Sequence, residues 1–378
     1  MKKVKLGEVC EIRIGKTPNR SQTLYWGGDY PWLSISDMKG KILCTTKEKI
    51  TQEAVQKEKM QIVSKGTVVM SFKLSIGKVG ILDENMYTNE AIANFVVKNN
   101  KMLFNEYLYY ALQGMNFDSL TDRAVMGKTL NKAKLNNLSI VYNEPFMQQQ
   151  IVLRLDGVNK LIESRKQQLS ELSKLVKSRF NEMFGDIFDN PQSKLEDHTE
   201  LNPNKKELLN FNGNVSFLPM SNVSENGKID LSINRNIDDV RKGFTFFKDN
   251  DVIVAKITPC FENGKGAPVF GLLNGVGFGS TEFHVLRPKN TVNTVWLYHV
   301  TMLSKFRLEG ERKMTGSGGQ RRITKDFINN FKLNIPPLSL QDEFADFVAQ
   351  VDKSQLAIQK SLEELETLKK SLMQEYFG

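Results

Sequence analysis

The residues with the clearest chemical potential are basic and amide side chains beside a glycine- and serine-containing loop. The largest such group consists of Arg312, Lys313, Gln320, Arg321 and Arg322. Backbone N–H groups of a loop like this can bind phosphate, and arginine or glutamine side chains can contact phosphates or base edges. The group therefore predicts contact with nucleic acid, with a set of solvated surface charges as the alternative.

Other polar or basic residues lie beside turns in the same way. Three of them precede an aromatic stretch that contains Trp26 and Trp32. The further candidates for DNA contact are Lys16, Thr17, Arg20, Lys73, Lys78, Lys128, Lys256 and Lys265. Both tryptophans, together with Trp296, are expected in the core rather than as platforms on which bases stack.

Motifs for catalysis are incomplete. Gly-Lys-Thr occurs at 15–17 and 127–129, but Cys10 and Asp122 stand where a phosphate-binding loop needs its first glycine. Ser280 likewise replaces the third glycine of a dinucleotide-binding pattern. The Asn-Pro-Pro-aromatic and Asp-Pro-Pro-aromatic motifs that would allow methylation of a base amino group are absent from the sequence. No catalytic residue is predicted.

Two carboxylates, Glu90 and Glu282, lie in similar contexts, after an asparagine and after a threonine. They could act as a catalytic pair in equivalent places of the chain. Buried structural roles are the preferred interpretation for both.

Cysteines and histidines do not form a metal-binding pattern. The 3 cysteines are scattered, and none of the 3 histidines has a ligand spacing to a cysteine or to another histidine. We therefore expect no metal site. An odd number of scattered cysteines suits a reducing compartment, and no stretch is apolar enough for a signal sequence or a membrane span, which predicts a cytoplasmic protein without a membrane partner.

The chain repeats itself at an offset of 193 residues. Between 148–185 and 341–378, 12 of 38 aligned positions are identical without a gap. The match includes Gln148 with Gln341. Such internal similarity indicates one structural plan used twice.

Each repeated segment predicts a long helix with a narrow apolar seam. Apolar residues recur at alternating steps of four and three, as in a coiled coil, and no proline interrupts either segment. Each helix would be about 57 Å long at 1.5 Å per residue. The residues predicted to form the helix-pair interface are Ile151, Leu155, Val158, Ile162, Leu169, Leu172, Phe344, Val348, Val351, Ile358, Leu362 and Leu365.

The two helices are expected to pair antiparallel with each other. Residues 147–185 carry 7 basic and 4 acidic side chains, and 340–378 carry 4 basic and 8 acidic ones, so their net charges are opposite. Exposed ion pairs between them would contribute little individually. The alternative is that each helix packs only on its own globular region.

The fold class expected is α+β, with mixed α/β globular regions separated by the helix pair in a pseudo-two-fold repeat. The expected boundaries are a first recognition domain at 1–146, a first helix at 147–185, a second recognition domain at 186–339 and a second helix at 340–378. Apolar runs at 67–72 and 251–256 predict strands, and the stretches 107–112 and 296–299 predict short helices.

Together these features resemble the DNA-specificity subunit of type I restriction–modification systems. The residues that carry the resemblance are Gly15-Lys16-Thr17-Pro18-Asn19-Arg20, Tyr25-Trp26-Gly27-Gly28, Pro31-Trp32, Gly318-Gly319-Gln320-Arg321-Arg322-Ile323, Leu333-Asn334-Ile335-Pro336-Pro337-Leu338 and Gln341. The resemblance covers essentially the whole chain, and the alternation of globular regions with long helices is its most specific sign.

The resemblance implies two target recognition domains that each read one half of a split double-stranded DNA sequence. The helix pair would hold them about one duplex turn, roughly 34 Å, apart. The implied partners are two modification (methyltransferase) subunits, which bind S-adenosylmethionine, and restriction/translocase subunits, which use ATP and Mg²⁺. This chain is expected to bind none of these cofactors itself.

Two hypotheses from other classes remain open. One is a DNA-processing, nuclease-like enzyme with undetected catalytic carboxylates. The other is a scaffold whose coiled coil binds only protein. The net charge of +9 favours a polyanionic partner, which could be nucleic acid, an anionic membrane surface or an acidic protein. The scaffold predicts no salt-sensitive affinity for DNA.

Overall fold

The computed structural model describes residues 2–117, 122–124, 127–208, 211–317 and 319–378. The chain divides into two compact units. The first unit consists of 1–167 together with 359–378, and the second of 168–358. Two helices of 40 residues, α5 (Pro145–Phe184) and α11 (Leu338–Phe377), contribute to both units.

Both long helices begin two residues earlier and end one residue earlier than the repeat suggests. Pro145 is the first residue of α5, a position where the missing N–H of proline costs no helical hydrogen bond. Pro336 and Pro337 directly precede α11. The prolines therefore mark where each helix begins.

The main sheet of the first unit has five strands in the order β2-β9-β6-β7-β4. Neighbouring strands are antiparallel, except that β4 is parallel to β7. β6 and β7 are buried at every residue, which explains why they read as continuous apolar runs rather than alternating ones. The strands are β2 (Cys10–Ile14), β4 (Ile42–Leu43), β6 (Val68–Ser71), β7 (Val79–Leu82) and β9 (Ile92–Val97).

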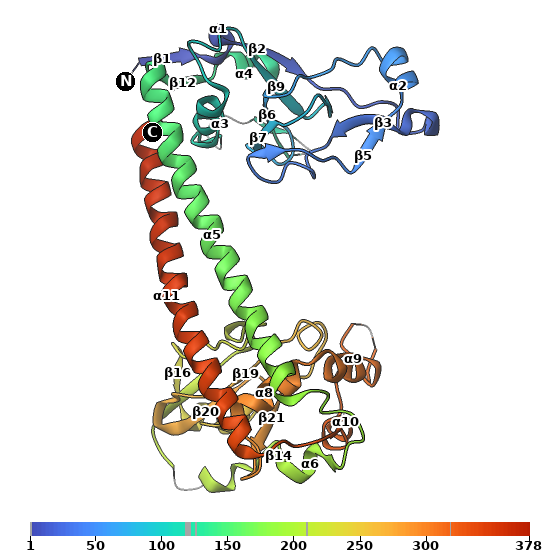
Figure 1. Ribbon diagram of the computed structural model, residues 1–378. Helices are drawn as coiled ribbons and strands as arrows, with labels where there is room; N and C mark the ends of the chain where they lie inside the picture. Colours follow the sequence, from blue (N-terminus) through green and yellow to red (C-terminus); the bar gives the residue numbers. More distant parts are fainter. Residues whose placement is uncertain (1, 118–121, 125–126, 209–210, 318) are drawn as a thin grey trace. The chain divides into compact units, whose positions relative to one another are not determined.

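Smaller sheets and short helices complete the first unit (Figure 1). Three strands form the sheet β5-β3-β8, and two pairs form β1-β12 and β10-β11. Their bounds are β1 (Lys2–Lys5), β3 (Trp26–Leu33), β5 (Glu48–Ile50), β8 (Tyr87–Thr88), β10 (Asp122–Ala124), β11 (Gly127–Thr129) and β12 (Ser139–Tyr142). The helices are α1 (Leu6–Val9), α2 (Gln52–Lys57), α3 (Asn105–Gln113) and α4 (Lys132–Asn137), with a 3₁₀ turn at Thr23–Tyr25.

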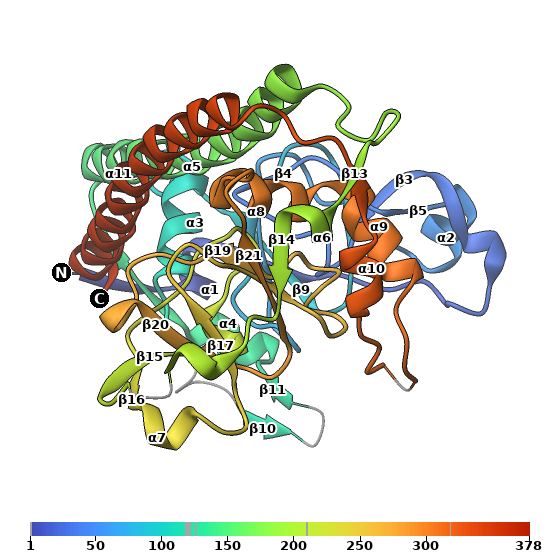
Figure 2. The ribbon, with the colours of Figure 1, turned by 90° about the horizontal axis from the view of Figure 1, so that it is seen from below.

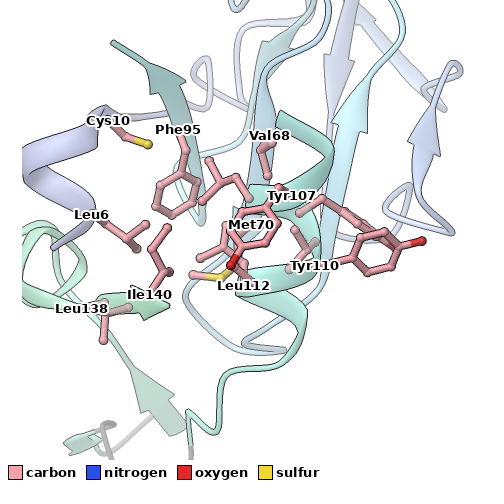
Figure 3. Close-up of a cluster of buried hydrophobic side chains, with 14 of the residues drawn as sticks. Leu6, Cys10, Val68, Met70, Phe95, Tyr107, Tyr110, Leu112, Leu138 and Ile140 are labelled. Atoms are coloured by element: carbon pink, nitrogen blue, oxygen red, sulfur yellow. The ribbon is translucent and has the colours of Figure 1, made fainter. Parts of the chain in front are cut away.

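The core of the first unit lies between α3 and the main sheet. Figure 3 shows Tyr107 and Tyr110 of α3 beside Val68, Met70 and Phe95 of the strands. Tyr107 donates its hydroxyl to the carbonyl of Val141 at 2.9 Å, so this large side chain is buried with its polar atom satisfied.

The second unit contains two four-stranded sheets. One has the order β14-β21-β18-β19 and is antiparallel throughout, and the other, β16-β15-β20-β17, contains the parallel pair β15 and β20. The strands are β14 (Thr199–Leu201), β15 (Asn214–Leu218), β16 (Asn234–Asn236), β17 (Thr245–Lys248), β18 (Val252–Ala255), β19 (Gly266–Pro268), β20 (Val276–Gly279) and β21 (Phe283–Pro288). A short pair joins β13 (Ser193–Lys194) to β22 (Lys332–Leu333).

Helices pack against the first of these sheets. α8 (Thr294–Met302) contacts β18, β19 and β21, and Figure 2 shows α8 beside β19 and β21. The other helices are α6 (Leu195–His198), α7 (Ile237–Val240), α9 (Ser304–Arg312) and α10 (Lys325–Asn329), with 3₁₀ turns at Lys205–Leu208, Met220–Asn222 and Leu273–Gly275. Trp296 of α8 is fully buried among aromatic side chains that include Phe180 and Phe184 of α5.

The two units share one topology, as the internal repeat predicts. The antiparallel order β14-β21-β18-β19 repeats β2-β9-β6-β7, and β13-β22 repeats β1-β12. The parallel contact of β15 with β20 repeats that of β3 with β8. α8 lies after β21 as α3 lies after β9.

Two glutamines at equivalent positions of the repeat, Gln148 and Gln341, help to give the two units the same structure. Gln148 is fully buried, accepts a hydrogen bond from the N–H of Phe104 at 3.0 Å and donates to the carbonyls of Met102 and Asn143. Each partner is a backbone group near the start of α3 or α5, so one amide satisfies three polar atoms.

Gln341 does the same in the second unit. Its side chain accepts from the N–H of Asn293 at 2.8 Å and donates to the carbonyls of Thr291 and Pro336. Two glutamines that lie 193 residues apart in the sequence therefore make equivalent hydrogen bonds in the two units.

Within each unit, α5 and α11 run antiparallel side by side (Figure 1). In the first unit Arg154 donates to the hydroxyl of Tyr376 at 3.0 Å, and in the second Arg179 pairs with Glu343 at 3.1 Å. The antiparallel pairing expected from the sequence is therefore present in both units.

All twelve residues predicted for the helix-pair interface are buried or half-buried. The buried ones are Ile151, Leu155, Val158, Ile162, Phe344, Val348, Val351 and Leu362, and the half-buried ones are Leu169, Leu172, Ile358 and Leu365. Near the helix ends the globular parts also supply contacts, because Ile151 and Leu155 belong to the core of the first unit and Phe344 to that of the second. The helices therefore pack on the globular regions near their ends and also pair with each other, so both alternatives expected from the sequence occur.

Candidate nucleic-acid interface

The Gly/Ser loop of the second unit follows α9 and is closed at its base. The N–H of Thr315 donates to the carbonyl of Arg322 at 3.0 Å, and the reverse bond measures 2.8 Å. Gly316 and Gly319 have φ values of +115° and +73°, which residues with a Cβ rarely adopt. The glycines therefore permit the tight turn that places the polar side chains of this loop.

Arg322 is held by a carboxylate. Its Nε and Nη2 atoms donate to both oxygens of Glu282 at 2.9 and 3.0 Å, and its Nη1 donates to the carbonyl of Gln320. This pairing holds the pKa of Glu282 below its usual range. Arg321 lies 3.8 Å from Glu262. Both arginines were predicted to contact DNA, but the structure places a carboxylate beside each, so their charge is partly neutralised within the unit.

Arg312, Lys313 and Gln320 are exposed around the same loop. Arg312 ends α9, where a positive charge complements the helix dipole. No carboxylate within ion-pair distance of either cation is found in the described part of the chain. These three side chains are consequently the members of the cluster that remain available for an external partner.

In the first unit, the turn after β2 is held by an ion pair and a hydrogen bond. Lys16 pairs with Glu58, with 2.8 Å between Nζ and Oε2, and Thr17 accepts a hydrogen bond from Asn89 at 3.2 Å. Lys16 remains half-exposed, with 53% of its side chain accessible. The turn therefore presents a charge whose position is fixed.

Arg20 combines two interactions. Its guanidinium pairs with Glu48 and lies 3.8 Å from the centre of the Trp26 ring. Trp26 is only half-buried, whereas Trp32 and Trp296 are fully buried as expected. The prediction of a core role for Trp26 is thus wrong in part, because its outer face carries Arg20.

The remaining predicted DNA contacts lie apart from these loops in sequence. Lys78 and Lys265 each donate to a backbone carbonyl at 3.3 Å, that of Ile35 and that of Met220. Lys73 is half-buried, with its ammonium 5.3 Å from the centre of the ring of Phe72.

Lys128 and Lys256 are the other two predicted DNA contacts. Lys128 lies in β11, opposite Arg123 of β10, but its side chain falls outside the described part of the structure. Lys256 follows β18, is half-buried and lines a pocket of the second unit.

Glu90 and Glu282 do not form a pair of equivalent buried carboxylates. Glu90 is exposed, which contradicts the expected burial, and Glu282 is half-buried as the partner of Arg322. In the register of the strands, the residue of the first unit that corresponds to Glu282 is Ala91, because the carbonyls of both accept the equivalent bond, from Phe72 and from Lys256. The sequence comparison that matched Glu90 with Glu282 was therefore wrong by one residue.

Sequence reasoning missed the carboxylates that hold the basic side chains. Glu48, Glu58 and Glu262 lie between 28 and 59 residues away from their partners along the chain. No local pattern marks such a partner. Only the pairing of strands and turns brings these charges together.

The described ranges of the chain show neither a metal-binding group nor a membrane-spanning helix. No cluster of three or more His, Cys, Asp and Glu side chains is found there that could hold a metal ion. Nor does any helix in those ranges combine the length and apolarity that crossing a membrane requires.

A family model decides the relationship of this chain to known proteins. The model of the type I restriction modification DNA specificity domain matches residues 1–174 and 188–368. The chain belongs to this family. It carries two segments of the domain, in agreement with the duplicated topology of the two units.

Curated relatives and solved structures agree with this membership. The specificity subunits of the type I restriction enzymes EcoAI and EcoEI, both from Escherichia coli, are 40% identical to the chain over 146 and 140 residues. These alignments cover 38% and 36% of this chain but only 24% and 23% of the relatives, so the chain matches about a quarter of their length.

The crystal structure of a type I restriction–modification S subunit from M. genitalium has the same fold. Its TM-score is 0.58 at 14% identity, and the match covers 100% of this chain and 96% of the other. The predicted fold class and the predicted family are confirmed. The relatives are named specificity subunits, and nothing in these comparisons supports a nuclease-like enzyme.

Proposed function

We propose that this chain is the DNA-specificity subunit of a type I restriction–modification complex and that it reads an asymmetric, bipartite double-stranded DNA target. The observation that carries the proposal is the match of two segments of a DNA specificity domain to a chain whose two units share one topology. One plan used twice supplies two reading sites, and different side chains on them give two different half-sites.

The side chains best placed to read DNA are the available members of the basic loops. In the second unit these are Arg312, Lys313 and Gln320. Arginine and glutamine can donate to base edges in the major groove, and lysine contacts to phosphates fix the register of the protein on the duplex. Lys16, Arg20 and Arg322, each held by a carboxylate of its own unit, would chiefly shape these loops.

The partners we propose are two modification subunits and the restriction/translocase subunits. S-adenosylmethionine, ATP and Mg²⁺ would be bound by those partners and not by this chain, and the complex would act in the cytoplasm. The incomplete nucleotide-binding motifs around Cys10 and Asp122 support this division of labour.

The test is methylome sequencing of a host that carries this chain with its modification subunit. We expect one methylated motif that consists of two different half-sites separated by a spacer of unspecified bases. A control host carries the modification subunit without this chain and should lack the motif. A continuous or palindromic motif that depends on this chain would contradict the proposal.

The nuclease-like alternative predicts a different result. Purified chain alone, incubated with DNA and Mg²⁺, should leave the DNA intact if the chain only binds. Cleavage without partner subunits would favour the enzyme.

A further inference from the structure

The second unit contains a basic pocket at the ends of several strands. Its volume is about 310 Å³, and its wall includes residues that follow β14 and β18, residues of β17 and β21, and the first residue of α10. The polar side chains that matter for its chemistry are those of Asn202, Lys205, Lys256, Thr281, His284 and Lys325. No acidic side chain lines the pocket in the described part of the unit.

The three lysines differ in how they are held. Lys205 donates to the carbonyls of Phe244 at 2.6 Å and Arg241 at 3.1 Å, and burial lowers its pKa. An ammonium group has three donors, so two carbonyls fix its position and leave one donor unused by them.

Lys256 and Lys325 make no ion pair or side-chain hydrogen bond with any other described residue. Lys256 is nevertheless half-buried. Lys325 is exposed and Lys205 has its two carbonyl partners, so Lys256 is the one of the three described lysines whose charge is partly out of water without an ion pair. A charge held in this way is destabilising, which is unusual for a purely structural residue, although the carboxylate of Glu282 lies near enough to interact with it electrostatically.

His284 forms a rigid, uncharged part of the wall. It is 4% exposed, with Nε2 placed 3.1 Å from the carbonyl of Ile323 and Nδ1 placed 3.1 Å from the amide of Asn202. The carbonyl requires a proton on Nε2, so the amide of Asn202 donates to Nδ1. Burial, together with Lys256 and Lys325, lowers the pKa of His284 to about 4.

The first unit serves as an internal control, because the same place there is apolar core. Phe72 receives and makes the same two backbone bonds as Lys256, donating to Ala91 and accepting from Leu130 where Lys256 donates to Glu282 and accepts from Ile323. Phe72 is 3% exposed and belongs to the core of the first unit.

The second wall residue has changed in the same way. The strand register places Ala93 of β9 where His284 lies in β21, since Ala93 pairs with Met70 and His284 with Val254. The shared fold therefore does not require a polar pocket at this place, and its two polar wall residues are specific to the second unit.

We propose that this pocket binds a phosphoryl group and that, in the assembled complex, the group is a backbone phosphate of the DNA. The proposal rests on the proposed DNA-reading function. Three ammonium groups around a concave wall without carboxylates favour an anion, and a neutral imidazole and an amide add shape without opposing charge. The pocket would anchor one phosphate and thereby fix the second unit on the duplex, without reading sequence.

The test uses the full chain with two probes, a mixed-sequence DNA duplex and inorganic phosphate. Lys256→Gln and Lys325→Gln each remove one pocket charge. Lys256→Arg keeps the charge, and Lys353→Gln removes an exposed lysine of α11 as the matched control. DNA affinity is measured over a series of salt concentrations, and phosphate binding by calorimetry.

We expect Lys256→Gln to weaken DNA binding about tenfold at low salt and to reduce the slope of log affinity against log salt by about 0.9, as the loss of one phosphate contact predicts. Lys325→Gln should act in the same direction. Lys256→Arg should restore most of the affinity, and Lys353→Gln should change it less than twofold.

The possible outcomes distinguish a failure of the pocket proposal from a failure of the proposed DNA-binding function. A wild-type chain without salt-sensitive DNA affinity would remove the proposed function, and saturable phosphate binding lost in Lys256→Gln would then identify a site for free phosphate. If the wild type binds DNA and the two pocket variants behave like Lys353→Gln with both probes, the pocket proposal is wrong while the function stands.

Discussion

At the scale of single residues, the two copies of the repeat share a pair of glutamines that make the same hydrogen bonds. Gln148 and Gln341 each satisfy one backbone N–H and two carbonyls at the junction between a globular region and a long helix. Both glutamine side chains are fully buried, so water does not readily replace the amide. Arg20 and Arg322 illustrate the opposite case, in which a side chain that looks ready for DNA is held by a carboxylate of its own unit.

Replacement of either glutamine should be costly. We expect Gln341→Ala to lower the free energy of unfolding of the second unit by about 2–4 kcal/mol, because three polar groups lose their partner. Gln148→Ala should have the same effect on the first unit. Chemical denaturation of each variant measures this, and Gln149→Ala, at an exposed neighbouring position of α5, is the control. Equal stabilities of Gln148→Ala and Gln149→Ala would contradict the assigned role.

At the scale of elements, the long helices have two faces. Leu155 is fully buried in the core of the first unit, whereas Leu153, two residues earlier on α5, is 66% exposed. The seam predicted from the sequence therefore separates buried from exposed leucines correctly on the same turn of helix. The apolar seam of each long helix packs against different partners along its length. Near the helix ends it packs against the core of a globular region, and within both units it also faces the other long helix.

This contrast gives a matched pair of substitutions. Leu155→Ala should lower the free energy of unfolding by about 2–5 kcal/mol, because it removes a buried side chain and leaves a cavity. Leu153→Ala should change it by less than about 0.5 kcal/mol. Denaturant midpoints of both variants provide the measurement. Similar losses from both substitutions would show that the seam has been assigned to the wrong face.

At the scale of the whole molecule, the two units differ in their response to acid. All three histidines, His198, His284 and His299, belong to the second unit. Burial lowers the pKa of His299 to about 4, and the pKa of His284 is also lowered to about 4. The first unit contains no histidine.

The second unit should therefore lose stability first as the pH falls. Below the ordinary histidine pKa of 6.5, the unfolded chain binds protons that the two folded imidazoles do not, so unfolding becomes easier until the pH reaches about 4. Between pH 6.5 and 5 we expect a loss of about 2 kcal/mol for each imidazole. Hydrogen exchange of β18 and β21 compared with β6 and β9 measures the two units separately, and His299→Phe should remove about half of the effect. An equal loss of protection in both units would refute the assignment.

Much of the architecture could be predicted from the sequence. The offset of 193 residues, the apolar seams and the prolines before them are local or periodic signals, because helices and turns depend on neighbouring residues. The strands at Val68–Ser71 and Val252–Ala255 and the helices that contain 107–112 and 296–299 follow from the same kind of signal.

What the sequence by itself determined was the plan of the molecule, namely a unit used twice, with a long helix after each copy and basic loops on both. Only the tertiary structure decided which of the basic residues are available. Glu48 and Glu282 hold Arg20 and Arg322, and Lys205, Lys256 and Lys325 come together at one pocket although up to 120 residues separate them. The physical reason is that charge pairing acts through distances in space, which are set by strand pairing and not by spacing along the chain.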